Sequence, residues 1–219
     1  METIAIISKA IAIIAASWAI ISGVGAWKRE FIGKRKIELA EDVLASFFEV
    51  KDAIASIRNP FSYQGEGKTR KRGEGESPDE SELLDRGFIV FERYEAYKEV
   101  FVRFNTLKYK FMASFGPESE DVFSETNKIM NRIFFSARQL ATNYWQRQGK
   151  VPMEDEEFKK HLDDMHKFEG IFWDRMDEKD VIRQELQELQ AKLDDLTKPC
   201  FEEPMKTYEI FTKPLFKKG

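Results

Sequence analysis

The sequence predicts an all-α membrane protein, in which one N-terminal transmembrane helix precedes a cytosolic antiparallel bundle of four or five helices. Three observations lead to this fold class. An uncharged apolar run lies near the N-terminus, apolar residues recur at helical spacing through most of the remaining chain, and strand-like alternation is missing over any useful length. With 219 residues, 42% hydrophobic and 34% charged, the chain is long enough for one sizeable core and an anchor.

The anchor is predicted over residues 1–27. The run Ala10–Trp27 contains no charged residue, and Thr3–Trp27 is long enough to cross a hydrocarbon core of roughly 30 Å at about 1.5 Å per residue. Lys9 lies near one end of this stretch, where its long side chain can reach the headgroups. The alternative is a long apolar helix buried in a protein core.

Basic residues follow the apolar run, whereas a cleaved signal peptide carries them before it. These residues are Lys28, Arg29, Lys34, Arg35 and Lys36. The positive-inside rule places this flank, and the chain after it, in the cytoplasm, with the N-terminus on the outer side of the cell inner membrane. We also expect the five side chains to contact anionic lipid.

Small residues recur four positions apart in the anchor, at Ala15, Ala19 and Gly23. Such spacing allows close approach between membrane helices, so it predicts self-association into a homo-oligomer or packing against another membrane helix. An anchor rich in alanine and isoleucine also produces such spacings by chance.

The first cytosolic element is predicted to be an amphipathic helix over residues 28–58, which ends at Asn59-Pro60. A glycine-rich mobile loop is expected over residues 59–77. Its basic residues form a candidate contact with a partner or with lipid, although a solvated loop is the ordinary interpretation. These residues are Lys68, Arg70, Lys71 and Arg72. Direct nucleic-acid binding is not expected, because no aromatic residue lies among them and the net charge of the chain is −4.

Residues 78–198 are predicted to complete the bundle together with residues 28–58. Ser77-Pro78 begins one helix and Gly116-Pro117 ends it, a second helix runs to Gly149, and a third opens at the acidic cluster 154–157 with an apolar face that extends to Met176. A last helix is expected to end at Lys198. An irregular tail with three prolines is predicted over residues 199–219, where Phe201, Tyr208, Phe211 and Phe216 dock on the bundle or on a partner.

The sequence offers little material for catalysis or for metal binding. His161 and His166 are five positions apart, so on a helix their rings point in different directions and make poor co-ligands. The histidine patterns of the HEPN and HD families, a phosphate-binding loop and a nucleophile elbow are all missing. Cys200 is the single cysteine of the sequence, so an intrachain disulfide cannot form. We predict no cofactor, no metal and no enzymatic activity.

The function expected from these features is that of an interaction or effector protein, whose cytosolic domain binds or senses a protein or ribonucleoprotein. In layout the chain is similar to small membrane-anchored effectors of bacterial antiphage systems, such as those encoded beside retrons. That resemblance implies a role in abortive infection, in which the membrane segment damages the membrane. The alternatives are a passive tether or assembly factor, and an enzyme with an unrecognised site, for which His161, His166 and Cys200 are the residues to mutate.

Overall fold

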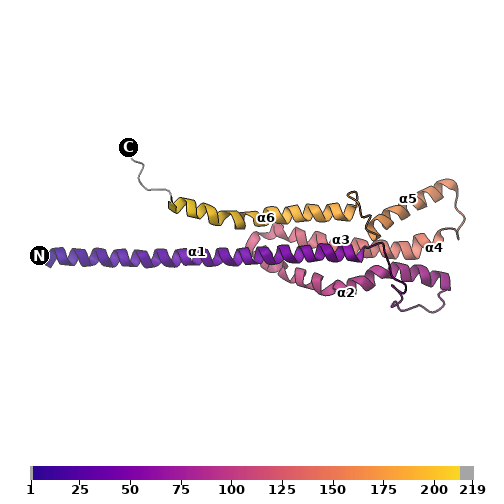
Figure 1. Ribbon diagram of the computed structural model, residues 1–219, viewed down its shortest axis with the longest axis horizontal. Helices are drawn as coiled ribbons and strands as arrows, with labels where there is room; N and C mark the ends of the chain where they lie inside the picture. The colour runs from indigo at the N-terminus through magenta and orange to yellow at the C-terminus, as the bar shows by residue number, and fades with distance from the viewer. Residues whose placement is uncertain (1, 213–219) are drawn as a thin grey trace. The chain divides into compact units, whose positions relative to one another are not determined.

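The computed structural model describes residues 2–212, and within them the side chains of residues 9, 11–28 and 30–202. This part of the chain is helical and contains no strand, as the sequence predicted. Figure 1 shows the helices in chain order. The residues divide into two compact units. Unit 1 comprises residues 1–41 and 197–219, and unit 2 comprises residues 42–196.

Two long helices contribute residues to both units. Helix α1 runs over Glu2–Ile57, and helix α6 runs over Val181–Thr212. The end of α1 confirms the predicted stop at Asn59-Pro60, because a residue that precedes proline disfavours helical backbone angles.

The C-terminal segment differs from the sequence prediction. Helix α6 passes through Pro199 and continues to Thr212, where an irregular tail was expected from residue 199. A proline removes one helical hydrogen bond and bends a helix, but it does not stop a helix whose neighbouring turn is held by packing. Thr197, two positions earlier, is buried. The predicted docking of Tyr208, Phe211 and Phe216 concerns side chains outside the described residues.

The helices of unit 2 begin and end close to the local signals in the sequence. Helix α2 spans Pro78–Phe115, and the Ser77 hydroxyl accepts a hydrogen bond from the Glu80 amide, as expected of a capping residue. After a 3-10 turn, η1 (Pro117–Ser119), helix α3 spans Glu120–Gln139. A π-helical segment, η2 (Leu140–Tyr144), leads into the short helix α4 (Trp145–Arg147).

Two features of this region were not predicted. The π-helical turn η2 interrupts what the sequence suggested was one helix up to Gly149. Helix α5 covers Asp155–Phe172, so it begins at the acidic cluster but ends before Met176, which has a φ of 57° and is exposed. The helix ends where Trp173 adopts an extended backbone conformation, with φ −100° and ψ 142°, and no sequence rule assigns the positive φ that follows to methionine.

The core of unit 2 combines many aliphatic side chains with a smaller group of aromatic ones. Phe104 of α2 lies between Phe47 of α1 and Phe123 of α3, with ring centroids 5.9 Å and 4.5 Å away, and all three rings are fully buried. Gly87 lets α2 approach η2 and the end of α3 closely, because a Cβ atom on it would lie 2.5 Å from the Cβ of Ala141 in η2 and 3.0 Å from the Ala137 carbonyl oxygen in α3. Helix α3 also contacts α5.

Candidate functional site

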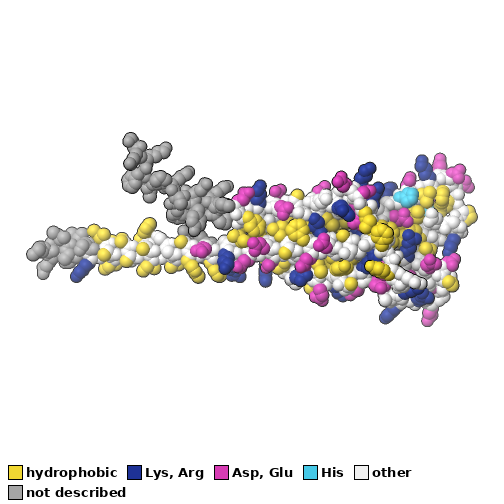
Figure 2. All heavy atoms as spheres, viewed as in Figure 1, with side chains coloured by type: hydrophobic (Ala, Val, Ile, Leu, Met, Phe, Trp, Pro, Cys, Tyr) yellow, Lys and Arg dark blue, Asp and Glu magenta, His cyan; other side chains and the backbone are white. Residues whose placement is uncertain are grey.

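The N-terminal part of α1 exposes its apolar side chains all around the helix. Ile14, Trp18 and Ile21 are 69%, 72% and 71% exposed, and hydrophobic side chains follow the helix along this stretch (Figure 2). Among the described residues, α1 is the one helix that is long and apolar enough to cross a membrane. Water is a poor solvent for such a surface, so this stretch is the first candidate functional surface.

The predicted stripe of small residues is open in the structure. Ala15 and Ala19 are exposed, and a Cβ atom added to Gly23 would meet no atom within 4 Å. The described residues therefore leave this face of the helix uncovered. Self-association through it stays a prediction.

The basic residues that follow the anchor differ in the groups that they contact. Lys34 pairs with Glu38 at 3.9 Å, whereas the guanidinium carbon of Arg35 lies 5.7 Å from the centre of the Phe31 ring. Lys28 is exposed and Lys36 is half-buried. The side chain of Arg29 lies outside the described residues.

The loop between α1 and α2 is braced by ion pairs and hydrogen bonds, although the sequence suggested a mobile segment. Arg93 of α2 pairs with Glu66, with an Nε to Oε1 distance of 2.6 Å. It also donates to the backbone carbonyls of Asn59 and Phe61 at 2.6 Å and 2.8 Å. The hydrogen bond from Arg93 lowers the pKa of the Glu66 carboxyl against the opposing effect of burial.

A second set of contacts holds the basic part of the same loop. Arg70 donates to Glu76 at 2.6 Å and to Asp85 at 3.1 Å, and Arg72 also reaches Asp85. The hydrogen bond from Arg70, followed by that from the Gly73 amide, lowers the pKa of Glu76 to about 2.

The four basic residues that were predicted to form one contact site fall into two pairs with different contacts. Arg70 and Arg72 are paired within the chain, so they contribute little free charge to the loop surface. Lys68 and Lys71 are exposed, and no ion pair is recorded for either of them within the described residues.

Sequence reasoning missed two exposed aromatic side chains of this loop. Phe61 and Tyr63 are 72% and 83% exposed, although Arg93 and Glu66 hold the backbone on which they stand. Large exposed aromatic residues on an ordered backbone are typical of protein-binding surfaces. In the sequence, the one indication of this surface is a pair of aromatic residues in an otherwise polar segment. The contacts that order their backbone are seen only in the structure.

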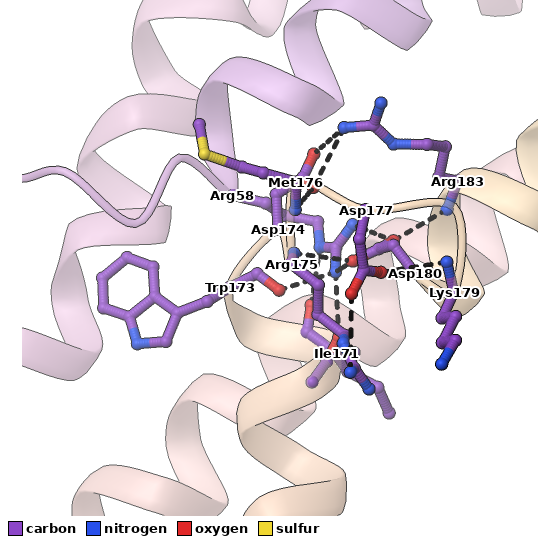
Figure 3. A network of polar contacts seen from close by, with 11 residues as sticks. Arg58, Ile171, Trp173, Asp174, Arg175, Met176, Asp177, Lys179, Asp180 and Arg183 are labelled. Carbon is purple, nitrogen blue, oxygen red and sulfur yellow. Dashed lines mark hydrogen bonds and ion pairs between the residues drawn. The ribbon is translucent and has the colours of Figure 1, made fainter.

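The connection between α5 and α6 contains the most buried polar network of unit 2 (Figure 3). Arg58, which directly follows α1, forms a two-pronged pair with Asp180, with both distances at 2.8 Å and both side chains at most 1% exposed. The remaining donors of Arg58 are bound by backbone carbonyls, namely those of Gly170, Ile171 and Trp173.

Asp180 is held from both sides in this network. Burial raises the pKa of its carboxyl, but the hydrogen bonds from Arg58 and from the amides of Arg175 and Arg183 outweigh that effect and lower it. Because every polar atom of the pair has a partner inside the protein, the network fixes the connection, and it presents no free group to a substrate.

The residues considered for catalysis are not brought together. His161 is buried, its ring lies 5.2 Å from that of Tyr144, and its Nε2 has no hydrogen-bond partner. His166 is exposed, and Cys200 is half-buried. The part of the chain that the structure describes holds no cluster of three or more His, Cys, Asp or Glu side chains suited to a metal ion.

No protein-family model, curated protein or solved structure matches the chain. The candidate functional surfaces of the chain are therefore the apolar anchor helix and the braced loop that carries Phe61 and Tyr63.

Proposed function

We propose that the protein is a single-pass membrane protein whose helical domain lies in the cytoplasm and binds a cytosolic protein, without catalysing a reaction. The observation that carries the anchoring is the apolar surface of α1, which is exposed on all sides over residues 11–27. The basic residues that follow it support the cytoplasmic placement of the rest of the chain. In this proposal the helices of unit 2 form an antiparallel bundle.

The braced loop supports the binding role. Phe61 and Tyr63 provide apolar area on an ordered backbone, and the unpaired cations Lys68 and Lys71 belong to the same loop. A hollow of about 880 Å³ beside the loop is lined by Ser62 and Lys68 among others, whereas Phe61 and Tyr63 lie outside its lining. This combination suits a protein surface that carries an apolar pocket with an acidic rim.

A photo-crosslinking amino acid placed at position 63 tests this surface in cells. Position 109 is the matched control, because Tyr109 is 75% exposed on α2. We expect crosslinked products of defined mass from position 63, and their loss when Lys68 and Lys71 are both replaced by Glu. Equal products from both positions, or none from position 63, would contradict a partner site on the loop.

The anchor has two possible roles, which one growth experiment separates. The full chain and a variant without residues 2–27 are induced in bacteria, and growth and membrane potential are followed together. If the anchor is an effector that assembles through its small residues, only the full chain depolarises cells, and replacing Ala19 and Gly23 by Leu prevents it. If the anchor is a tether, neither chain depolarises cells.

A further inference from the structure

Trp27, Phe31 and Arg35 follow one another along one side of α1, because residues four positions apart share a helix face. The two rings stack with their centroids 5.6 Å apart and an angle of 20° between their planes, and the Arg35 guanidinium lies over the Phe31 ring. Trp27 and Phe31 are nevertheless 64% and 47% exposed. The side chains thus form an ordered stripe that no other described residue covers.

The depth of this stripe follows from helix geometry. If Trp27 marks the edge of the hydrocarbon core, Phe31 lies about 6 Å beyond it along the helix axis. The headgroup layer on each side of a bilayer is roughly 5 to 7 Å thick. Side chains of a helix lean toward its N-terminus, which returns the Arg35 guanidinium to the level of Phe31. With Trp27 at that edge, the cation lies at the depth of the lipid phosphates.

Arg35 also differs electrostatically from its neighbour Lys34. Lys34 pairs with Glu38 one helical turn away, whereas no ion pair is recorded for Arg35 among the described residues. A guanidinium over an aromatic ring keeps its hydrogen-bond donors at the edge free for a planar or tetrahedral oxyanion. Arg35 is accordingly the better phosphate ligand of the two.

We propose that Trp27, Phe31 and Arg35 form a binding site for the headgroup of an anionic phospholipid. The two rings pack against the glycerol region, and Arg35 binds the phosphate. This inference rests on the proposed membrane span and adds to it a lipid preference located at one stripe of the helix.

The test uses the full chain in nanodiscs that contain a small fraction of brominated lipid, either phosphatidylglycerol or phosphatidylcholine. Bromine quenches tryptophan at short range, and the signal of Trp27 is obtained by subtracting that of the Trp27→Phe variant. We expect stronger quenching by brominated phosphatidylglycerol. Arg35→Gln should reduce this preference roughly fivefold, and Lys34→Gln, which removes the same charge, should leave it nearly unchanged.

The outcomes separate this inference from the proposed span. Quenching of Trp27 by neither lipid would overturn both, because the helix would not lie in the bilayer. Equal quenching by the two lipids would overturn the lipid site and leave the span intact. Equal losses in Arg35→Gln and Lys34→Gln would overturn it as well, since the preference would then follow total charge alone.

Discussion

Two arginine networks hold two of the irregular connections of unit 2, and they differ in burial. Arg58 and Asp180 secure the connection between α5 and α6 and are at most 1% exposed. Arg93 and Glu66 secure the loop between α1 and α2 and remain 10% and 13% exposed. Both arginines pair with one carboxylate and bind backbone carbonyls of the segment that they hold.

The difference shows how one type of interaction serves two purposes. A buried pair with every polar atom satisfied is costly to break, because one charge is left without water or a partner. A pair that keeps some contact with water loses less when it is broken, because its charges can be hydrated again, so it orders a loop at a lower cost. The buried network fixes the domain, and the surface network presents Phe61 and Tyr63.

The largest effect is expected from Arg58→Met. This change leaves the Asp180 carboxylate buried without its cation, which typically lowers the free energy of unfolding by about 3–5 kcal/mol. Thermal unfolding of the full chain in detergent, followed by circular dichroism, measures the loss. The double variant Arg58→Met with Asp180→Leu removes both charges and should recover part of it. No recovery would show that the backbone hydrogen bonds of Arg58 matter more than the pair.

A smaller and local effect is expected from Arg93→Met. The loop loses its hydrogen bonds to the carbonyls of Asn59 and Phe61, at a cost of about 2 kcal/mol that falls mainly on loop order. Limited proteolysis should cut within residues 59–77 many times faster, with a small change in the unfolding temperature. Arg103→Met is the control, because Arg103 pairs with Glu49 at a more exposed position. Faster cleavage in both variants would mean that Arg93 has no special role in the loop.

Local features of this fold could be predicted from the sequence, whereas the contacts of the networks could not. Helix starts and stops at Ser77-Pro78 and at Asn59-Pro60 depend on neighbouring residues, so a local rule finds them. Arg58 and Asp180 are 122 positions apart, and no local pattern connects them. The same holds for the loop, whose basic residues look free until Arg70 is seen to pair with Glu76 and Asp85.

Aromatic residues also show which features local sequence patterns can predict and which they cannot. Phe47 and Phe104 belong to apolar series at helical spacing, which favours burial, and both are fully buried in the structure. Phe61 and Tyr63 carry no periodic signal, and their exposure depends on how Arg93 directs the backbone. Helix α6 passes Pro199 because packing of the preceding turn outweighs the intrinsic cost of a proline.

The smallest effect is expected from the second set of contacts in the loop between α1 and α2, in which Arg70 pairs with Glu76, and it is a pH dependence. The pKa of Glu76 is lowered from its ordinary value of 4.5 to about 2, so its pairing stabilises the loop fully above pH 4.5 and is lost as the pH falls toward 2. Hydrogen exchange, corrected for intrinsic rates, should show falling protection of residues 66–77 over this range. In Glu76→Gln, residues 70–77 should be less protected at neutral pH and should lose most of their acid response, whereas the part of the loop held by Glu66 keeps its own, because Arg93 lowers the pKa of Glu66 separately. Glu74→Gln, at an exposed position, should behave as wild type. If Glu76→Gln kept the full acid response, another carboxylate would have to be the one that orders the loop.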